Sequence, residues 1–378
     1  MAEALKDQYG HEVIHWLAQQ IRNIDAGFPA ESFIQQAIVG FDELELMPRG
    51  KHLAVVLSNY LPDDYPQAVD ILVRSMGPKL TDSRSFGMSS FYYLPHSFYI
   101  SEYGLEYPQE SMAAMYQLTQ RFTAEFCIRP FLLKYPELIL AQLKDWLSDP
   151  SEHVRRLISE GTRPRLPWGI ALKPFKQDPL AVLALLECLK DDSSLYVRRS
   201  VANNLNDIGK DNLALLCDTC SRWLEGADNR LEEADNNRRW LVNHALRSAI
   251  KRAEPQALAV LGYGPDIEVD IQVVDISPQK AVQGDSLTLT FRVSNLKSEP
   301  QPLLVDCAID YVKANGQTRA KVFKLKTVVL EAQQSQEFSK KVSLKNMSTR
   351  KHYSGHHSVR ALLNGVSYHL GGFDLTVD

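Results

Sequence analysis

One short stretch of the chain, residues 153–168, concentrates side chains that could bind phosphate and carry out chemistry. Its only carboxylate is Glu160, which precedes Gly161 near the end of a predicted helix, where negative charge is disfavoured. Arginine keeps its charge and can hold phosphate oxygens bidentately. The arginines and the indole of the stretch are Arg155, Arg156, Arg163, Arg165 and Trp168. Together they predict a phosphate-binding surface beside a reaction site.

Charge is segregated along the chain. The net charge is −4, yet residues 153–176 hold six basic side chains and one acidic one. Residues 266–378 hold 14 lysines and arginines against 12 acidic residues, so the acidic excess lies in the first part of the chain. A basic groove on an acidic body is the distribution that a nucleic-acid-binding protein requires.

Composition excludes several other classes of protein. A chain of 378 residues with 44% hydrophobic content predicts two or three compact units. The first residues lack a basic region followed by an apolar run, and no segment approaches the roughly 18 apolar residues of a membrane span. We therefore expect a cytosolic protein without a membrane partner.

The five cysteines fit neither a disulfide framework nor a four-ligand zinc site, because only Cys217 and Cys220 are close in sequence. We expect them to be reduced and buried. The spacing of this pair could support redox chemistry in a thioredoxin-like setting, but it falls in a helical run without that context. We expect no metal and no cofactor.

The spacing of apolar residues predicts a mainly α protein with a β domain at its C-terminal end. Through residue 262 the spacing is helical, and after 263–265 it alternates at the period of a strand over about seven short segments. We predict a helical domain over 1–263 and a small antiparallel β-sandwich over 266–378. Helical spacing is clearest at Leu133, Leu138, Leu140, Leu143 and Trp146.

An internal repeat defines the helical part. A set of seven positions recurs 43 residues later with six residues unchanged, and a weaker third copy follows about 41 residues on. This period is typical of HEAT-like helix pairs, which stack into an α-solenoid with a concave surface. The first copy is Leu140, Leu143, Trp146, Asp149, Val154, Arg155 and Arg156, and the second is Leu183, Leu186, Leu189, Asp192, Val197, Arg198 and Arg199.

The repeat also places arginines at regular intervals. In such a stack each second helix lines the concave side, and neighbouring helices lie roughly 10 Å apart, so successive arginine pairs could follow a nucleic-acid backbone. The same pattern is compatible with a common start of HEAT helices in protein-binding solenoids, and both interpretations stay open. The three pairs are Arg155 with Arg156, Arg198 with Arg199, and Arg238 with Arg239.

A basic loop in the C-terminal domain is a second candidate for phosphate contacts. No acidic residue occurs between Phe338 and Phe373, and the loop over 345–357 is rich in small and polar residues. We predict DNA contacts there, the alternative being a solubilising loop on a domain that braces the helices. His356 and His357 have no further metal ligand at a recognisable spacing. The predicted contacts are Lys345, Arg350, Lys351 and His352.

Three segments of the chain resemble the AlkC branch of the AlkC/AlkD-type DNA alkylation repair glycosylases, which are built from HEAT-like repeats. These segments read LTQRFTAEFCIRPF over 118–131, VRRLISEGTRPRLPW over 154–168 and VRRSVANNLND over 197–207. The predicted sandwich is similar to the immunoglobulin-like domain of many AlkC-type chains. The resemblance covers most of the helical domain.

The resemblance implies a monofunctional DNA glycosylase that starts base excision repair on duplex DNA. Its substrates would be bases made cationic by alkylation, such as 3-methyladenine and 3-methylcytosine, removed without flipping into a deep pocket. The enzyme would act as a monomer. By the same resemblance, the motif positions Glu125, Glu160, Trp168 and Asp207 would form the catalytic cluster.

The chemistry of such a reaction explains the residue types. Alkylation of a ring nitrogen already gives the leaving base its positive charge, so the enzyme needs no general acid. It needs anions near an oxocarbenium-like sugar and a water held for attack at C1′. We expect Asp207 and Glu160 to supply both, with Glu125 completing the cluster and the Trp168 ring facing a cation.

Each of these residues also has a structural alternative. Glu125 could pair with Arg129, Glu160 with Arg156 or Arg163, and Asp207 could cap the turn at Gly209. Trp168 could anchor its loop, and the aromatic run over 91–107 is expected to pack the interior. At the level of the whole chain, the alternative is a non-catalytic HEAT scaffold that binds nucleic acid or an acidic protein.

Overall fold

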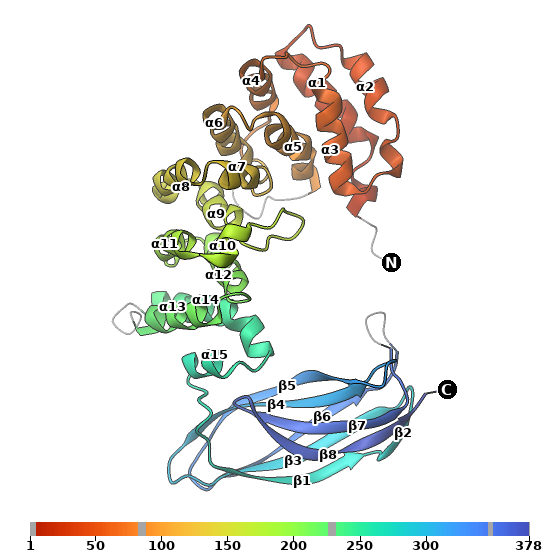
Figure 1. Cartoon of the computed structure of the whole chain (residues 1–378), viewed down its shortest axis with the longest axis vertical. Helices are drawn as coiled ribbons and strands as arrows, with labels where there is room; N and C mark the ends of the chain where they lie inside the picture. The colour runs from red at the N-terminus through yellow and green to blue at the C-terminus, as the bar shows by residue number, and fades with distance from the viewer. Residues whose placement is uncertain (1–4, 82–87, 226–231, 347–350, 378) are drawn as a thin grey trace. The chain divides into compact units, whose positions relative to one another are not determined.

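The computed structural model describes residues 5–81, 88–225, 232–346 and 351–377, and it is helical first and all-β afterwards (Figure 1). This order confirms the predicted fold class of an α-solenoid followed by an immunoglobulin-like sandwich. The helices are α1 (His11–Ile24), α2 (Ala30–Ile38), α3 (Leu46–Leu57), α4 (Tyr65–Ser75), α5 (Leu94–Tyr103), α6 (Pro108–Thr119), α7 (Ile128–Lys134), α8 (Pro136–Asp145), α9 (Glu152–Gly161), α10 (Lys173–Gln177), α11 (Leu180–Leu189), α12 (Leu195–Ile208), α13 (Leu213–Glu225), α14 (Glu232–Lys251) and α15 (Pro255–Val260).

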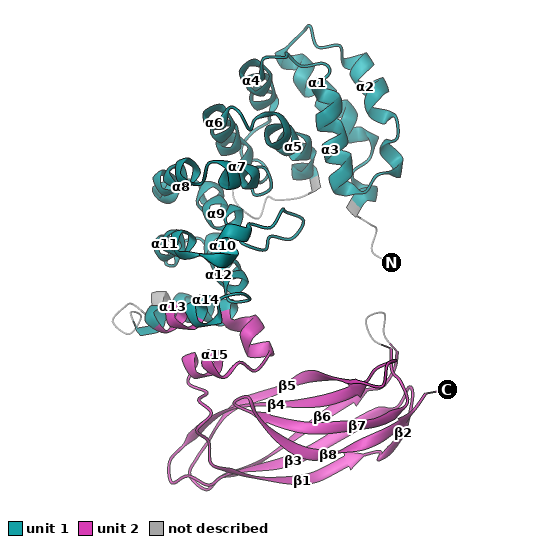
Figure 2. Cartoon of the chain, in the orientation of Figure 1, with its two compact units in different colours: residues 1–216, 222–245 teal, residues 217–221, 246–378 magenta. Residues whose placement is uncertain are grey.

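The chain forms two compact units (Figure 2). The first comprises residues 1–216 and 222–245, and the second comprises 217–221 and 246–378. Secondary structure changes from helix to strand between the end of α15 at Val260 and the start of β1 at Val269. The end of α14 and all of α15 thus belong to the same compact unit as the strands. The domain limits of 1–263 and 266–378 stay a prediction.

The repeat identified in the sequence corresponds to two stacked helix pairs, α8 with α9 and α11 with α12. The second helices of the pairs, α9 and α12, contact each other directly. Each forms because its apolar residues recur at three- and four-residue intervals and give one buried face. On α9 that face is Val154, Leu157 and Ile158, and on α12 it is Val197, Val201, Leu205 and Ile208.

The first arginine of each repeated pair ties the stack together. Arg155 donates from Nε and Nη2 to the carboxylate of Asp192 at 2.6 and 3.0 Å, and from Nη1 to the carbonyl of Asp149 at 2.7 Å. Arg198 repeats the arrangement, donating from Nη1 to the Asp192 carbonyl at 2.6 Å and from Nη2 to Asn237 at 2.9 Å. Each arginine therefore closes its own inter-helix loop and also binds the following repeat, Arg155 at the loop residue Asp192 and Arg198 at Asn237 on α14.

These contacts reduce the number of arginines in the three predicted pairs that can contact a nucleic-acid backbone. Arg155 and Arg198 form their hydrogen bonds inside the protein, and the buried Arg238 pairs with Asp191 in the same way. Their neighbours Arg199 and Arg239 are exposed. Only the second arginine of a pair is thus placed toward solvent, and Arg156 is the exception described below.

The second unit is a sandwich of two sheets, one in the order β1-β3-β6 and the other in the order β2-β8-β7-β4-β5. The prediction of about seven antiparallel strands differs in one respect, since the short β2 pairs with β8 in parallel. The strands are β1 (Val269–Ser277), β2 (Lys280–Val282), β3 (Ser286–Asn295), β4 (Gln301–Val312), β5 (Thr318–Leu330), β6 (Ser335–Ser343), β7 (Gly355–Leu363) and β8 (Val366–Thr376).

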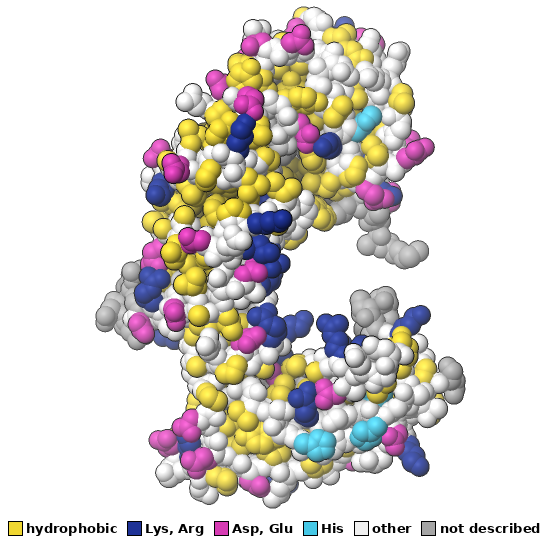
Figure 3. All heavy atoms as spheres, in the orientation of Figure 1, with side chains coloured by type: hydrophobic (Ala, Val, Ile, Leu, Met, Phe, Trp, Pro, Cys, Tyr) yellow, Lys and Arg dark blue, Asp and Glu magenta, His cyan; other side chains and the backbone are white. Residues whose placement is uncertain are grey.

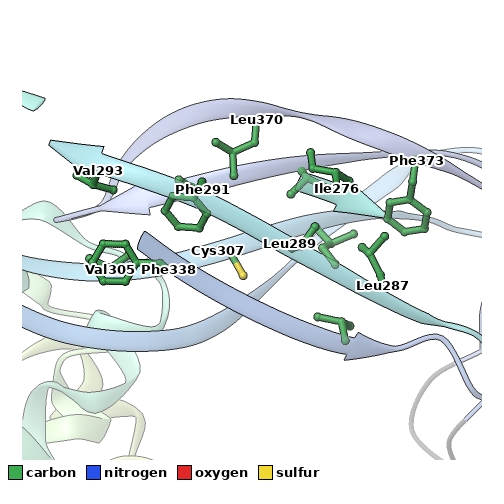
Figure 4. Close-up of a cluster of buried hydrophobic side chains, with 14 of the residues drawn as sticks. Ile276, Leu287, Leu289, Phe291, Val293, Val305, Cys307, Phe338, Leu370 and Phe373 are labelled. Carbon is green, nitrogen blue, oxygen red and sulfur yellow. The ribbon is translucent and has the colours of Figure 1, made fainter. Parts of the chain in front are cut away.

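Alternate residues of the strands fill the space between these sheets (Figure 4). Leu287, Leu289, Phe291 and Val293 are fully buried along β3, and the ring of Phe291 stacks on that of Phe338 from β6 with centroids 5.8 Å apart. This alternation is the period-two pattern of the sequence, because successive side chains of a strand point to opposite faces.

No helix in the described part of the chain is long and apolar enough to cross a membrane. All five cysteine thiols are free. Cys217 and Cys220 lie buried on α13, as expected for a helical run, whereas Cys188 is exposed and so departs from the prediction that all five are buried. It shares a face of α11 with the exposed Ala181 and Ala184, opposite the buried leucines of that helix.

Replacing Arg155 with alanine should lower the free energy of unfolding by about 1–3 kcal/mol, because it leaves the Asp192 carboxylate buried without its cation. Urea unfolding followed by helical circular dichroism measures this. Arg199→Ala, on an exposed position of α12, is the control and should change stability by no more than about 0.5 kcal/mol. Equal effects would contradict a structural role for Arg155.

Candidate active site

Three buried carboxylates come together from three segments of the first unit. Glu125 precedes α7, Glu160 is in the last turn of α9, and Asp207 is in the last turn of α12. They are 9%, 5% and 1% exposed. Direct packing of α9 against α12, the second helices of neighbouring repeats, brings the last two close together near the C-terminal ends of these helices. The sequence prediction that these carboxylates converge agrees with this geometry.

Two arginines bridge the carboxylates. Arg156 contacts Glu125 at 2.6 Å and Glu160 at 3.6 Å, and Arg163 contacts Glu160 at 2.6 Å and Asp207 at 2.8 Å. We call these five residues the ionic cluster. Carboxylates that are this deeply buried require such partners, because an isolated buried charge is expensive. In the cluster, negative and positive groups alternate from one end to the other.

Neutral and basic side chains complete the hydrogen bonding of the ionic cluster. Ser200 Oγ donates to Glu160 Oε2 at 2.6 Å, and Thr123 Oγ1 donates to Glu125 Oε2 at 2.9 Å. Lys210 Nζ lies 2.7 Å from Asp207 Oδ1. Each carboxylate is thus held by at least two donors, which fixes its orientation.

The electrostatics keep the central carboxylate ionised. Burial alone would raise the pKa of Glu160, but the charges of Arg156 and Arg163 and the hydrogen bond from Ser200 outweigh it and hold the pKa below its ordinary value. For Arg163, burial is likewise outweighed by Glu160 and Asp207, which raise its pKa. Glu160 is therefore an anion at neutral pH and can face a cation without first losing a proton.

An open cavity of about 950 Å³ leads to the ionic cluster. Its polar lining includes Glu125, Arg156, Glu160 and Arg163, and its aromatic lining includes Phe91, Phe122, Phe126, Trp168 and Tyr196. Asp207 is not among the described residues of this lining, since it lies behind Arg163 with 1% of its surface exposed. Glu125 and Glu160 are therefore accessible from the cavity, whereas Asp207 is not.

Trp168 projects from the loop between α9 and α10 into the edge of the cavity. It is 63% exposed, and its φ of 62° lies in the left-handed backbone region, which residues other than glycine rarely adopt. The indole does not anchor this loop by burial, since most of its surface is exposed and the buried side chains of the loop include Leu166 and Leu172. An exposed ring held in a strained conformation is available to a ligand.

The second arginines and the loop arginine lie around this site. Figure 3 shows basic side chains on the face of the first unit that carries α9, α10 and α12. Arg199 is exposed, lines the cavity and makes no ion pair with a described residue. Arg165 forms a partly exposed bidentate pair with Asp211, with N···O distances of 2.8 and 2.6 Å. Arg156 instead belongs to the ionic cluster, where Tyr196 stacks on its guanidinium.

The basic loop of the second unit is only partly as predicted. Lys345 and Lys351 are exposed. His352 is 4% exposed and packs edge-on against Tyr311, with ring centroids 5.3 Å apart. The prediction that its ring contacts DNA does not fit this buried position. Arg350 lies outside the described residues.

The structural alternatives for the carboxylates are resolved as follows. Glu125 pairs with Arg156 and not with Arg129, and Glu160 has both of the arginine partners that the sequence offered. Sequence reasoning overlooked Thr123 and Ser200, although both lie inside the segments that carry the family resemblance. Tyr196 carried no signal, because an aromatic residue in the first turn of a helix is ordinary.

Three comparisons with known proteins identify the family of the chain. Residues 270–377 match a family model described as the C-terminal immunoglobulin-like domain of the uncharacterised protein YhaZ. The chain is 36% identical over 362 residues to uncharacterised protein YhaZ of Bacillus subtilis (strain 168), covering 96% of both chains. It is 38% identical to the alkylpurine DNA glycosylase AlkC of Pseudomonas fluorescens, solved bound to DNA containing an abasic site analog. The TM-score is 0.83, with 99% of this chain and all of that one covered.

The lowered pKa of Glu160 predicts how its substitution changes acid stability. Because the folded-state pKa lies below the ordinary 4.5, the stability that Glu160 contributes is present above pH 4.5 and is lost as the pH falls through the folded-state pKa. Glu160→Gln should therefore be less stable than the wild type near neutrality, and the two should converge in acid. Urea unfolding across this pH range tests it. Glu137→Gln, an exposed position on α8, should run parallel to the wild type, and a Glu160→Gln curve that does the same would contradict the assignment.

Proposed function

This chain belongs to the AlkC-type family of DNA alkylation repair glycosylases, and we propose that it hydrolyses the N-glycosidic bond of cationic alkylated bases in duplex DNA. The observation that carries the proposal is the ionic cluster of three buried carboxylates, two of which, Glu125 and Glu160, line an open cavity. A scaffold that binds an acidic partner has no reason to place anions in its binding surface, so this group favours the enzyme over the scaffold. The similar AlkC was solved with an abasic site analog, which resembles the DNA left after base removal.

The ionic cluster suits the charge that develops in this reaction. As the bond between C1′ and the base nitrogen breaks, its electron pair neutralises the base and the sugar becomes an oxocarbenium-like cation. Glu125 and Glu160 line the cavity and face this cation, and Asp207 adds its negative charge from behind Arg163. A carboxylate then takes the proton of the water that attacks C1′. Preoriented anions of this kind stabilise a cationic transition state without reorganising.

For the carboxylates to act on a cation, some of their ion pairs with the arginines of the ionic cluster have to break when DNA binds. Arg156 and Arg163 balance the charge of the ionic cluster in the free protein. When a backbone phosphate draws one of these guanidinium groups outward, net negative charge is left where the sugar cation forms. The same side chains thus bind DNA and couple binding to catalysis.

The open form of the cavity supports action on a base that stays near the helix rather than in a deep pocket. We infer that 3-methylcytosine and 3-methyladenine are substrates, because both carry the positive charge that removes the need for a general acid. Trp168, at the edge of the cavity, faces the cationic sugar or base through its ring. We place the enzyme in the cytosol, on chromosomal DNA, as a monomer.

DNA contacts are assigned to the exposed basic residues. In the first unit these are Arg199, Arg239 and Arg165, the last of which exchanges Asp211 for a phosphate. In the second unit they are the exposed Lys345 and Lys351, with Arg350 as a further prediction. Phosphate contacts of this kind supply affinity without reading sequence, which suits an enzyme that must act at any lesion.

Glu160→Gln and Asp207→Asn should each slow single-turnover base release by about 10² or more, the usual cost of removing one electrostatic stabiliser. The assay measures free base from DNA containing 3-methylcytosine, 3-methyladenine or 7-methylguanine. Asp191→Asn, which removes the partner of the buried Arg238 elsewhere in the unit, is the control and should keep near wild-type release. Release of none of the three bases by the wild type would favour a scaffold.

Arg199→Ala should weaken DNA binding and reduce the slope of log affinity against log salt concentration by about one, the contribution of one phosphate contact. Arg155→Ala should leave that slope unchanged, because Arg155 is occupied by Asp192 inside the stack. Binding of fluorescently labelled duplex at several salt concentrations distinguishes the two. Equal slopes for both variants would show that Arg199 contacts no phosphate.

A further inference from the structure

A second arginine in the resembling segment over 118–131 has no part in the reaction described so far. Arg129 is the second residue of α7 and is fully buried. Its Nη1 donates to the carbonyl of Gly161 at 3.0 Å, and its Nε donates to the carbonyl of Ile170 at 2.5 Å. One guanidinium group therefore joins the end of α9 to the loop that follows it.

Both of its acceptors adjoin residues of the candidate active site. Gly161 follows Glu160 directly in the chain, and Ile170 lies two residues after Trp168. The bonds from Arg129 thus fix the backbone beside the central carboxylate and beside the exposed indole at the same time. No other residue described here bridges these two backbone segments through its side chain in this way.

The loop around Trp168 depends on such a fixed point. The indole is 63% exposed and gains little from burial, and its backbone holds a φ of 62°. A residue in this conformation keeps it only where the surrounding structure enforces it. The loop is closed at its base by a hydrogen bond from Leu172 N to the Pro164 carbonyl at 3.2 Å, which leaves its tip to be held by other contacts.

Gly169 makes room for the guanidinium. A Cβ at this position would lie 3.2 Å from both Cδ and Nε of Arg129, and 3.0 Å from a methyl group of Leu166. These distances are tighter than ordinary van der Waals contact. A methyl group at this position would therefore press on Arg129, which would have to shift by a few tenths of an ångström.

The charge of Arg129 does not explain its place. It forms no ion pair with a described residue, and its Nη2 has no hydrogen-bond partner among them. Burial, together with the nearby charge of Arg163, lowers its pKa to about 10, which still leaves it protonated at neutral pH. A buried cation that is held by carbonyls, with one donor unsatisfied, is not optimised for stability.

We propose that Arg129 is a positioning residue, which clamps the Trp168 loop to the end of α9 so that the indole and the Glu160 carboxylate keep a fixed mutual position. The inference rests on the proposed glycosylase function, in which both groups face the reacting nucleotide. Arg129 acts through the backbone, by its two directed hydrogen bonds, and does not touch the substrate.

The first test separates geometry from charge. Arg129→Lys keeps the positive charge but loses the fork that reaches two carbonyls, and Arg129→Met loses both. Both should slow single-turnover release at saturating enzyme by about 10- to 100-fold, the effect of a misplaced catalytic group, while DNA affinity changes less than about twofold. Near wild-type release by Arg129→Lys would overturn the proposal, because charge alone would then suffice.

A matched control accounts for lost stability. Arg49 is also a buried arginine that donates to backbone carbonyls, those of Leu44, Lys6, Tyr9 and Asp42. Arg49→Lys should lower the unfolding midpoint without slowing release. Gly169→Ala leaves Arg129 in place but crowds it, and should reproduce the loss seen with Arg129→Lys. Slower base release by Arg49→Lys, or wild-type base release by Gly169→Ala, would contradict a specific role of Arg129 as a clamp.

A double-mutant cycle shows whether Arg129 acts through the indole. In a Trp168→Ala background, Arg129→Lys should cost much less than it does in the wild type, because the positioned group is gone. If the two substitutions instead reduce the rate of base release independently, so that their effects multiply in the double variant, the proposal is overturned.

Quenching of tryptophan fluorescence by acrylamide provides a readout that needs no catalysis. The Trp168 signal is the difference between a protein and its Trp168→Phe counterpart, and Arg129→Lys should change its quenching while Arg49→Lys does not. If the wild type releases no base, the proposed function fails, but unchanged Trp168 quenching in Arg129→Lys would separately overturn the clamp.

Discussion

Burial of three carboxylates at one place in a helical stack is the constraint on which the rest of the site depends. Glu125, Glu160 and Asp207 are almost inaccessible, and each would be destabilising without a compensating cation. Arg156 and Arg163 supply that compensation and join the three anions into the ionic cluster. The arginines therefore make the anions tolerable in the free protein, and they are also the groups best placed to respond to phosphate.

The repeat architecture lets equivalent positions serve different purposes. Arg155 and Arg198 make the same contacts to the loops of their repeats, so the first arginine of the pair belongs to the scaffold. The second arginine differs between repeats: Arg156 faces Glu125 and Glu160, whereas Arg199 faces solvent at the edge of the cavity. A solenoid repeats its backbone geometry, but the side chains that surround each position are set by neighbours that do not repeat.

Much of the fold and part of the site could be predicted from the sequence. The change from helical to alternating apolar spacing, the repeat of Leu140–Arg156 at 183–199 and the convergence of the carboxylates all follow from local pattern or from family resemblance. The place of Asp207 behind Arg163, the buried ring of His352 and the contacts of Arg129 did not. Each depends on which segment, distant in sequence, comes to lie within hydrogen-bonding or packing distance.

Local pattern in the sequence was enough to predict which parts of the chain are helical and which are strands, because one buried face imposes a characteristic period. The sequence also shows four arginines around the single carboxylate Glu160 over 153–168, with the arginine pair repeated in the next helix pair. Tertiary packing sets which of those arginines are hydrogen-bonded inside the stack and which stay exposed, where a ligand can reach them. An arginine of fixed charge and reach bonds to whichever acceptors surround it. Asp192, Asp207 and the Ile170 carbonyl reach Arg155, Arg163 and Arg129 only through tertiary packing, because they lie 37, 44 and 41 residues away in the sequence.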